Sequence, residues 1–208
     1  MTVTVILGVT LIALLYWVSM ALPPLRKRNQ LAAQQKLQEI ALTLFEDKGF
    51  GGVTMQEIAL AGGVSESTLY RYFGTKEALV VWDEYDMDTE LVCQFQLQPP
   101  VGAFRDALIL TLTEQGDLAF LLRRVQFLFR TPQVHAAAIQ KDLEERDELA
   151  AAFAAVGGRR IASLQDDVSA GSCMAALDAA INHWQKSNGK TELAELLKQA
   201  FAAIEHSV

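Results

Sequence analysis

The chain has 208 residues, of which 51% are hydrophobic and 21% charged, with a formal net charge of -7 and a mean hydropathy of +0.17. This length suits one or two domains and is ample to bury a core. An acidic excess, taken over the whole chain, argues against a nucleic-acid binder, and two cysteines are too few for a disulfide framework.

The charge is unevenly distributed along the chain. Residues 1–76 carry seven basic and five acidic side chains, a net charge of +2. Residues 77–208 carry 11 basic and 20 acidic side chains, a net charge of -9. A mildly basic front end therefore precedes an acidic body, and the front end alone remains compatible with nucleic acid.

Residues 1–25 form an apolar leader without a charged side chain, and Val3–Leu22 is long enough to cross a bilayer as a helix of roughly 30 Å. The basic residues that follow at Arg26–Arg28 would keep the rest of the chain in the cytoplasm. Two other interpretations stand beside this membrane anchor. In the first, the leader is a soluble helix that docks on the rest of the protein. In the second, translation starts at Met20, so that most of the leader is never made.

Beyond the leader, apolar residues recur at helical spacing and no run alternates with the period of a strand. The first helix ends at Lys48, where Gly49 follows. Further helices are predicted at 54–62, 65–73, 75–98, 101–115, 118–130, 132–156, 168–186 and 191–205. The sequence therefore predicts an all-α protein.

Residues 54–73 have the pattern of a helix-turn-helix. Thr54 and Glu57 form a capping box at the start of the first short helix, and Ser65 caps the second. Between them, Gly62 and Gly63 permit a sharp reversal of the chain. The second helix is then the recognition helix, which in this motif lies in the major groove.

The candidate DNA contacts offer hydroxyls, amphipathic rings or a cation. They are Thr54, Ser65, Ser67, Thr68, Tyr70, Tyr72 and Lys76. Tyr70 and Tyr72 cannot point the same way, because positions two apart on a helix diverge. We expect Tyr70 and Lys76 to matter most, the lysine by holding a phosphate at the start of the next helix.

The segment from about residue 34 to residue 82 resembles the DNA-binding domain of the TetR/AcrR family of transcriptional regulators. The signature elements stand in order as Gly49-Phe50, Thr54 to Ala59, Gly63-Val64-Ser65, Thr68-Leu69-Tyr70, Tyr72-Phe73 and Lys76-Glu77. The resemblance implies that Thr54 caps its helix against a phosphate and that Lys76 fixes the DNA backbone. It also places Ser67, Thr68, Tyr70 and Tyr72 toward DNA, with Met55 and Glu66 where relatives often carry base-reading residues.

The domain is expected to span residues 26–82, with Arg26 and Arg28 in a basic arm before the first helix. Such an arm can follow the DNA backbone or enter the minor groove. The alternative is a membrane-flanking or merely solvated charge cluster.

Residues 83–208 resemble the variable ligand-binding and dimerisation domain of the same family, in the branch of mycofactocin-type regulators, which implies an acyl-CoA-like ligand. Phe120 and Phe127 lie on a helix that is apolar nearly all round, beside Arg123 and Arg124. These four are the candidate ligand-binding residues. Alternatively, the aliphatic parts of the two arginine side chains cover the core, and their guanidinium groups pair with nearby carboxylates.

The last two helices carry wide apolar stripes rich in small residues, which predict half of a four-helix interface in a homodimer. A dimer would also serve DNA binding, since one short recognition helix buries too little surface for tight specific binding. The DNA partner is therefore expected to be a double-stranded, palindromic operator.

No constellation for catalysis or metal binding is present: His135, His183 and His206 are scattered, and no phosphate-cradling loop occurs. We expect no enzyme and no cofactor. The sequence predicts a ligand-responsive, homodimeric repressor in the cytoplasm. The alternative is a membrane-tethered helical interaction protein whose helix-turn-helix binds a protein partner.

Overall fold

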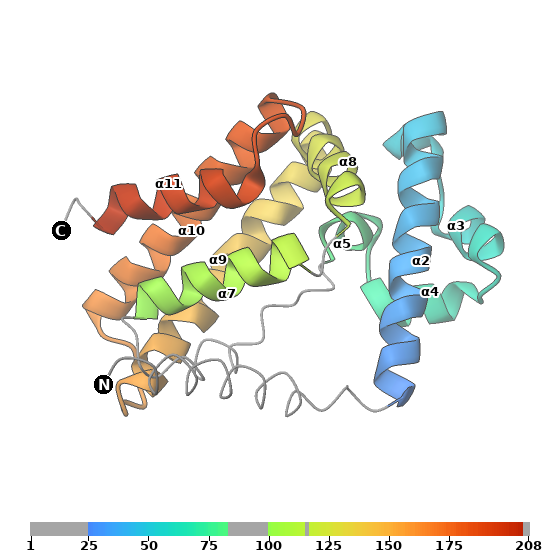
Figure 1. Ribbon diagram of the computed structural model, residues 1–208. Helices are drawn as coiled ribbons and strands as arrows, with labels where there is room; N and C mark the ends of the chain where they lie inside the picture. The colour runs from blue at the N-terminus through green and yellow to red at the C-terminus, as the bar shows by residue number, and fades with distance from the viewer. Residues whose placement is uncertain (1–24, 83–99, 115–116, 206–208) are drawn as a thin grey trace.

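The computed structural model describes residues 25–82, 100–114 and 117–205, and every regular element in these ranges is a helix (Figure 1). The all-α prediction is confirmed. The N-terminal group consists of α2 (Leu25–Lys48), η1 (Phe50–Gly52), α3 (Met55–Gly62), α4 (Glu66–Phe73) and α5 (Lys76–Val81). The body consists of α7 (Pro100–Glu114), α8 (Leu118–Arg130), α9 (Pro132–Val156), α10 (Leu164–Lys186) and α11 (Leu193–Glu205).

The N-terminal group folds around one face of α2. Phe45 of α2, Ile58 of α3, Leu69 of α4 and Leu79 of α5 are each at most 1% exposed and belong to one core. Burying four such side chains contributes on the order of 6–12 kcal/mol before chain entropy is counted. This core fixes the angle at which α4 leaves the domain.

The turn between α3 and α4 requires both of its glycines. A Cβ on Gly62 would collide with the side chain of Leu37, so glycine lets α3 approach α2 closely. Gly63 has a φ of 67°, in the left-handed region, and its N–H donates to the carbonyl of Leu60 at 3.2 Å. The reversal expected from the sequence is therefore present.

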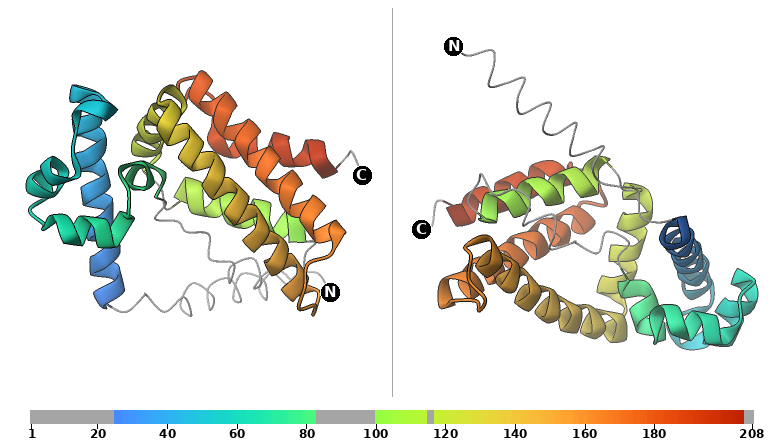
Figure 2. Two further views of the ribbon diagram at one scale, coloured as in Figure 1. Left: turned by 180° about the vertical axis from the view of Figure 1, so that it is seen from behind. Right: turned by 90° about the horizontal axis from the view of Figure 1, so that it is seen from below.

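In the body, α10 is the central helix. It lies beside α9 in both views of Figure 2 and also packs against α7 and α11. Phe104, Phe153, Trp184 and Phe201 form the centre of this core, each at most 3% exposed. Much of the apolar stripe of α11 is consequently used inside the subunit.

Helix α8 joins the two cores. Phe127, which is 4% exposed, stacks on Phe45 of α2 with ring centroids 5.8 Å apart. On the same side, Arg123 forms an ion pair with Glu46 at 2.6 Å. The opposite side of α8 carries Leu121 and Val125 of the body core. The N-terminal group and the body therefore meet along α8.

Three predicted boundaries were wrong by more than two residues. The helix expected over 75–98 ends at Val81, because Trp82 adopts a non-helical backbone (φ -53°, ψ 130°); residues 83–99 lie outside the described ranges. The basic arm at Arg26–Arg28 is not an arm, since α2 already begins at Leu25. Helix α10 begins at Leu164 and not at 168, because Ser163 and Asp166 form a capping box there.

The apolar leader, with Val3–Leu22, belongs to residues 1–24 and lies outside the described residues. Among the helices that are described, none combines the length and the apolar character that a bilayer crossing demands.

Candidate DNA interface and ligand cavity

Helix α4 is amphipathic, and its two faces have separate tasks. Leu69 and Phe73 are buried in the N-terminal core. Ser67, Tyr70 and Arg71 lie on the exposed face, with Tyr70 48% exposed. A helix held by its apolar side and polar on the other can enter a groove without disturbing its own packing.

The two tyrosines of α4 diverge, as their spacing predicts. Tyr72 is half-buried and packs edge-on against Phe73, with ring centroids 6.3 Å apart. The guanidinium of Arg71 lies over the Tyr72 ring, 5.5 Å from its centroid. Tyr70 is therefore the freer ring, and Tyr72 supports Arg71.

The hydroxyl of Ser65 is occupied within the protein. It accepts from the N–H of Thr68 at 3.2 Å and lies 2.9 Å from Ser67 Oγ and 2.8 Å from Thr68 Oγ1. This side chain fixes the start of α4 and the orientation of its neighbours. Ser65 and Ser67 are both exposed, but Ser65 has three such contacts and Ser67 only the one to Ser65, so Ser67 is the less committed of the two candidate DNA contacts.

Thr54 and Lys76 lie close together around the loop that precedes α3. Thr54 Oγ1 accepts from the N–H of Glu57 at 3.2 Å, and the N–H of Thr54 donates to Glu57 at 2.9 Å, completing the capping box. That bond to the backbone of Thr54, helped by Lys48, holds the pKa of Glu57 below its ordinary value. Lys76 Nζ donates to the carbonyls of Phe50 at 2.7 Å and Val53 at 3.0 Å.

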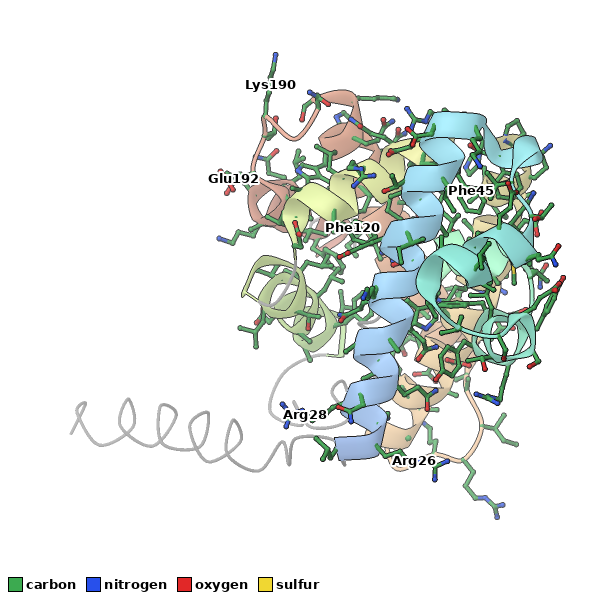
Figure 3. The ribbon with its side chains drawn as sticks, turned by 90° about the vertical axis from the view of Figure 1, so that its right-hand side faces the viewer. Arg26, Arg28, Phe45, Phe120, Lys190 and Glu192 are labelled. Carbon is green, nitrogen blue, oxygen red and sulfur yellow. The ribbon has the colours of Figure 1, made fainter. Side chains whose placement is uncertain are left out.

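The ammonium of Lys76 also lies over the Phe50 ring, 4.3 Å from the centroid. Two of its three N–H groups therefore hold the loop, and the third bonds to neither carbonyl. Met55, expected at a base-reading position, is 7% exposed and belongs to the core. Arg26 and Arg28 are exposed at the start of α2, at the end opposite Phe45 (Figure 3).

A cavity of about 420 Å³ lies in the body between α7, α8, α9 and α10. Its apolar wall includes Phe104, Leu108, Leu112, Leu121, Val125, Leu128 and Phe129. Its polar lining is Thr111, Arg124, His135, Lys141, Asp142, Glu145, Glu148, Asp178 and Asn182. The size and the mixed lining are those of a small-molecule site.

Of the four predicted ligand-binding residues, only Arg124 lines this cavity. Phe120 and Phe127 pack against the N-terminal core, and Arg123 reaches Glu46 and, at 3.3 Å, Thr43 Oγ1. These three predicted residues therefore do not line this cavity, and a ligand-binding role for them stays a prediction. The side of α8 that carries them faces α2, and the other side faces the cavity.

One backbone carbonyl connects the cavity to the DNA-binding group. The carbonyl of Trp82, at the end of α5, accepts from Gln38 Nε2 of α2 at 2.7 Å and from Arg124 of α8 at 2.5 Å. Gln38 also donates to the carbonyls of Leu79 at 3.0 Å and Val80 at 3.3 Å. Val81, in the same segment, lines the cavity.

Sequence reasoning missed Gln38. Its signal was a polar residue on the apolar face of α2, between Leu37 and Ala41, where it is only 2% exposed. A buried amide in such a place needs hydrogen-bond partners from elsewhere in the chain. Here the partners are the last carbonyls of α5, so Gln38 caps the C-terminal end of that helix.

Comparisons with known proteins agree with this architecture. The family model for bacterial regulatory proteins of the tetR family matches residues 39–81, and that for the MftR C-terminal domain matches residues 98–208. A candidate mycofactocin biosynthesis transcriptional regulator, MftR, of Mycobacterium tuberculosis is 24% identical over 85% of this chain and 91% of its own length. The HTH-type transcriptional regulator TcmR of Streptomyces glaucescens is 28% identical over 70% of this chain and 68% of its own length.

Among solved structures, a candidate fatty acid metabolism regulator of Clostridium perfringens superposes with a TM-score of 0.51, covering 83% of this chain and 98% of that chain. At 14% identity this likeness shows the fold alone. No cluster of potential metal ligands occurs in the described part of the chain, and the relatives are transcriptional regulators, not enzymes. The chain belongs to the TetR family of bacterial regulatory proteins, and its C-terminal half is of the MftR type.

Proposed function

We propose that this regulator is a homodimeric repressor that binds a palindromic operator in the cytoplasm and leaves it when a small molecule with an apolar body enters the cavity. The proposal rests on the exposed face of α4. Ser67, Tyr70 and Arg71 project from this face, and the other face of the helix is buried in the core. Thr54, Thr68, Tyr72 and Lys76 support the DNA contact from the flanks.

The release step rests on the shared carbonyl of Trp82. A molecule that fills the cavity contacts Arg124 and Val81 and thereby changes the position of the end of α5. Gln38 transmits that change to α2, on which α3 is packed, and α4 packs in turn on α3 and α5. The two recognition helices of the dimer then no longer match successive major grooves, about 34 Å apart.

The apolar wall of the cavity supports an apolar ligand, and acyl-type molecules fall within this class. The position of the cavity beside α5 supports its regulatory use. Loss of DNA affinity on binding requires only that the ligand favour the state in which the helices are mismatched.

The experiment is a fluorescence-anisotropy titration of the full-length dimer with duplex DNA from the region flanking its own gene. We expect specific binding, and a loss of about 10- to 100-fold for Tyr70→Ala, since one good base contact contributes about 1–3 kcal/mol. Arg160→Ala, an exposed cation in the loop between α9 and α10, serves as the control and should bind normally. Absence of specific binding at low salt, with the dimer confirmed, contradicts the proposal.

A further inference from the structure

The polar side of the cavity is predominantly acidic. Asp142, Glu145 and Glu148 of α9 and Asp178 of α10 line it, against Lys141 and His135 of α9 and Arg124 of α8. Helix α7 contributes Thr111 and no charged group to the lining. Among the described residues of the lining, four carboxylates therefore face one arginine, one lysine and one histidine.

Both permanent cations are engaged within the protein. Lys141 Nζ pairs with Glu145 at 2.7 Å, and Arg124 donates to the carbonyl of Trp82. No ion pair or hydrogen bond from the described residues reaches the carboxylates of Asp142 and Asp178. These two lie on neighbouring helices and repel each other.

The environment of the two carboxylates is unfavourable for their charge. Burial, with the nearby charges of Asp178 and Glu145, raises the pKa of Asp142 to about 6, although Lys141 acts in the opposite direction. Asp178 is exposed on the neighbouring helix; partial burial of its carboxylate still raises its pKa, and His135 only partly offsets this. A cation placed between them would remove this cost, whereas an anion would increase it.

The opposite wall is apolar, with Phe104 and Leu108 of α7 and Leu121 and Val125 of α8. The cavity thus has an apolar half and an acidic half. A molecule that fills both halves is an amphiphile with a positive group.

We propose that the cavity binds an apolar molecule carrying an amine or quaternary ammonium group, with the cation held between Asp142 and Asp178. This inference rests on the proposed function, which makes the cavity the effector site, and narrows the chemistry of the effector. An anionic acyl thioester would instead be repelled by the carboxylates of the acidic half. The lysine and the arginine of the described lining are already bonded within the protein and would not offset this repulsion.

The test is isothermal titration calorimetry on the full-length dimer at pH 7.5, with probes of matched chain length below their micellar concentrations. The cations are decylamine, decyltrimethylammonium and an aromatic quaternary amine; the comparison probes are decanol, decanoate and decanoyl-CoA. We expect at least one cation to bind about tenfold or more tightly than decanol and every anion. For decylamine the affinity should also rise several-fold from pH 5 to pH 7.5, because Asp142 ionises over this range while the amine stays charged.

Asp142→Asn and Asp178→Asn keep the side-chain shape and remove the charge. The double variant should bind decylamine and decanol alike, whereas Asp167→Asn, an exposed carboxylate of α10 outside the cavity, should retain the preference. Circular dichroism and operator affinity check that each variant is folded.

Tighter binding of decanoate or decanoyl-CoA, failure of all three cations to bind, or an unchanged cation preference in the double variant overturns the inference. Operator binding is measured separately on the same samples. If a cation binds in the cavity and leaves operator affinity unchanged, the release step of the proposed function fails while the inference on ligand class stands. If the operator binds and no cation preference is found, only the inference fails.

Discussion

At the scale of single residues, the side chains of the DNA-binding surface divide into those that can meet DNA and those that hold the surface in shape. Tyr70 and Ser67 are exposed and lie outside the caps, whereas Ser65 and Thr54, although exposed too, form caps, and Lys76 holds a loop. A residue of the second kind affects DNA binding through the stability of the domain as well as through contact.

Lys76→Met should therefore destabilise the protein. It removes two charge-assisted hydrogen bonds to the carbonyls of Phe50 and Val53, at a cost of about 1–3 kcal/mol in the free energy of unfolding. Urea denaturation measures this change, and Lys36→Met, at an exposed position of α2, should stay within about 0.5 kcal/mol of the wild type. An unchanged stability with weaker DNA binding would mean that Lys76 serves a phosphate alone.

Asp142 gives the protein a characteristic dependence on pH. Its pKa of about 6 in the folded chain lies above the ordinary 3.8, so folding takes up a proton between these values. The contribution of Asp142 is most favourable below pH 4 and is lost as the pH rises through 6. Because the group is only half buried, solvent screening leaves about 1 kcal/mol of this effect.

Asp142→Asn should therefore gain stability relative to the wild type at pH 7.5 and little at pH 4.5. Urea denaturation at the two pH values checks this, with the exposed Asp47→Asn as the control that should show no such difference. Equal effects of Asp142→Asn at both pH values would contradict the raised pKa.

At the scale of elements, α5 is the segment whose position depends on the rest of the fold. It has six residues, too few to be stable alone, and its last carbonyls accept from Gln38 and Arg124. Gln38→Leu keeps the approximate volume and leaves the carbonyls of Leu79 and Val80 without this donor. We expect a loss of about 2 kcal/mol in the free energy of unfolding and a weaker response of operator affinity to ligand.

The matched control is Gln133→Leu, an exposed glutamine near the start of α9. It should leave both stability and response near those of the wild type. Hydrogen exchange at the N–H of Trp82, which donates to Ala78 at 2.7 Å, reports directly on the end of α5. Protection that persists in Gln38→Leu would show that α5 is held by its packing alone.

The same distinction between local and distant causes explains which elements could be predicted from the sequence. The helix-turn-helix depends on local signals, namely the caps at Thr54 and Ser65 and the left-handed Gly63, and these were interpreted correctly. The cap at Ser163 was an equally local signal and was overlooked. The end of α5 was not predictable, because its partner Gln38 lies 41 to 44 residues earlier in the chain.

The ligand-binding residues illustrate a second limit. Helix α8 is apolar on both sides, so its sequence could not tell which side faces α2 and which faces the cavity. A run of acidic residues such as that of α9 is typical of a solvated helix face, and Glu144 and Asp147 are indeed exposed. Asp142 and Glu145 instead point into a space that exists only when α10 packs beside α9.

At the scale of the whole molecule, the net charge of -7 hides a division between a front end of +2 and a body of -9. In Figure 1 helices α2, α3 and α4 lie on one side of α8 and α7, α9, α10 and α11 on the other, so in the part of the chain that the structure describes the two regions are separated in space as well as in sequence. Repulsion between the acidic body and phosphates then favours an orientation in which the N-terminal helices face DNA.

Dimerisation also makes a geometric prediction about the operator. Two recognition helices held by one rigid dimer read half-sites about one helical turn apart, on the same side of the duplex. Inserting five base pairs between the half-sites of an operator selected from random DNA turns one half-site by about half a turn, out of reach of its helix. Affinity should then fall to that of an operator with one half-site destroyed, as measured by anisotropy at constant salt. The same insertion outside the operator should change nothing, because the phosphate contacts are identical and only the spacing differs. If the internal insertion is tolerated, each subunit binds independently, and a ligand could not release the protein by changing the separation of its recognition helices.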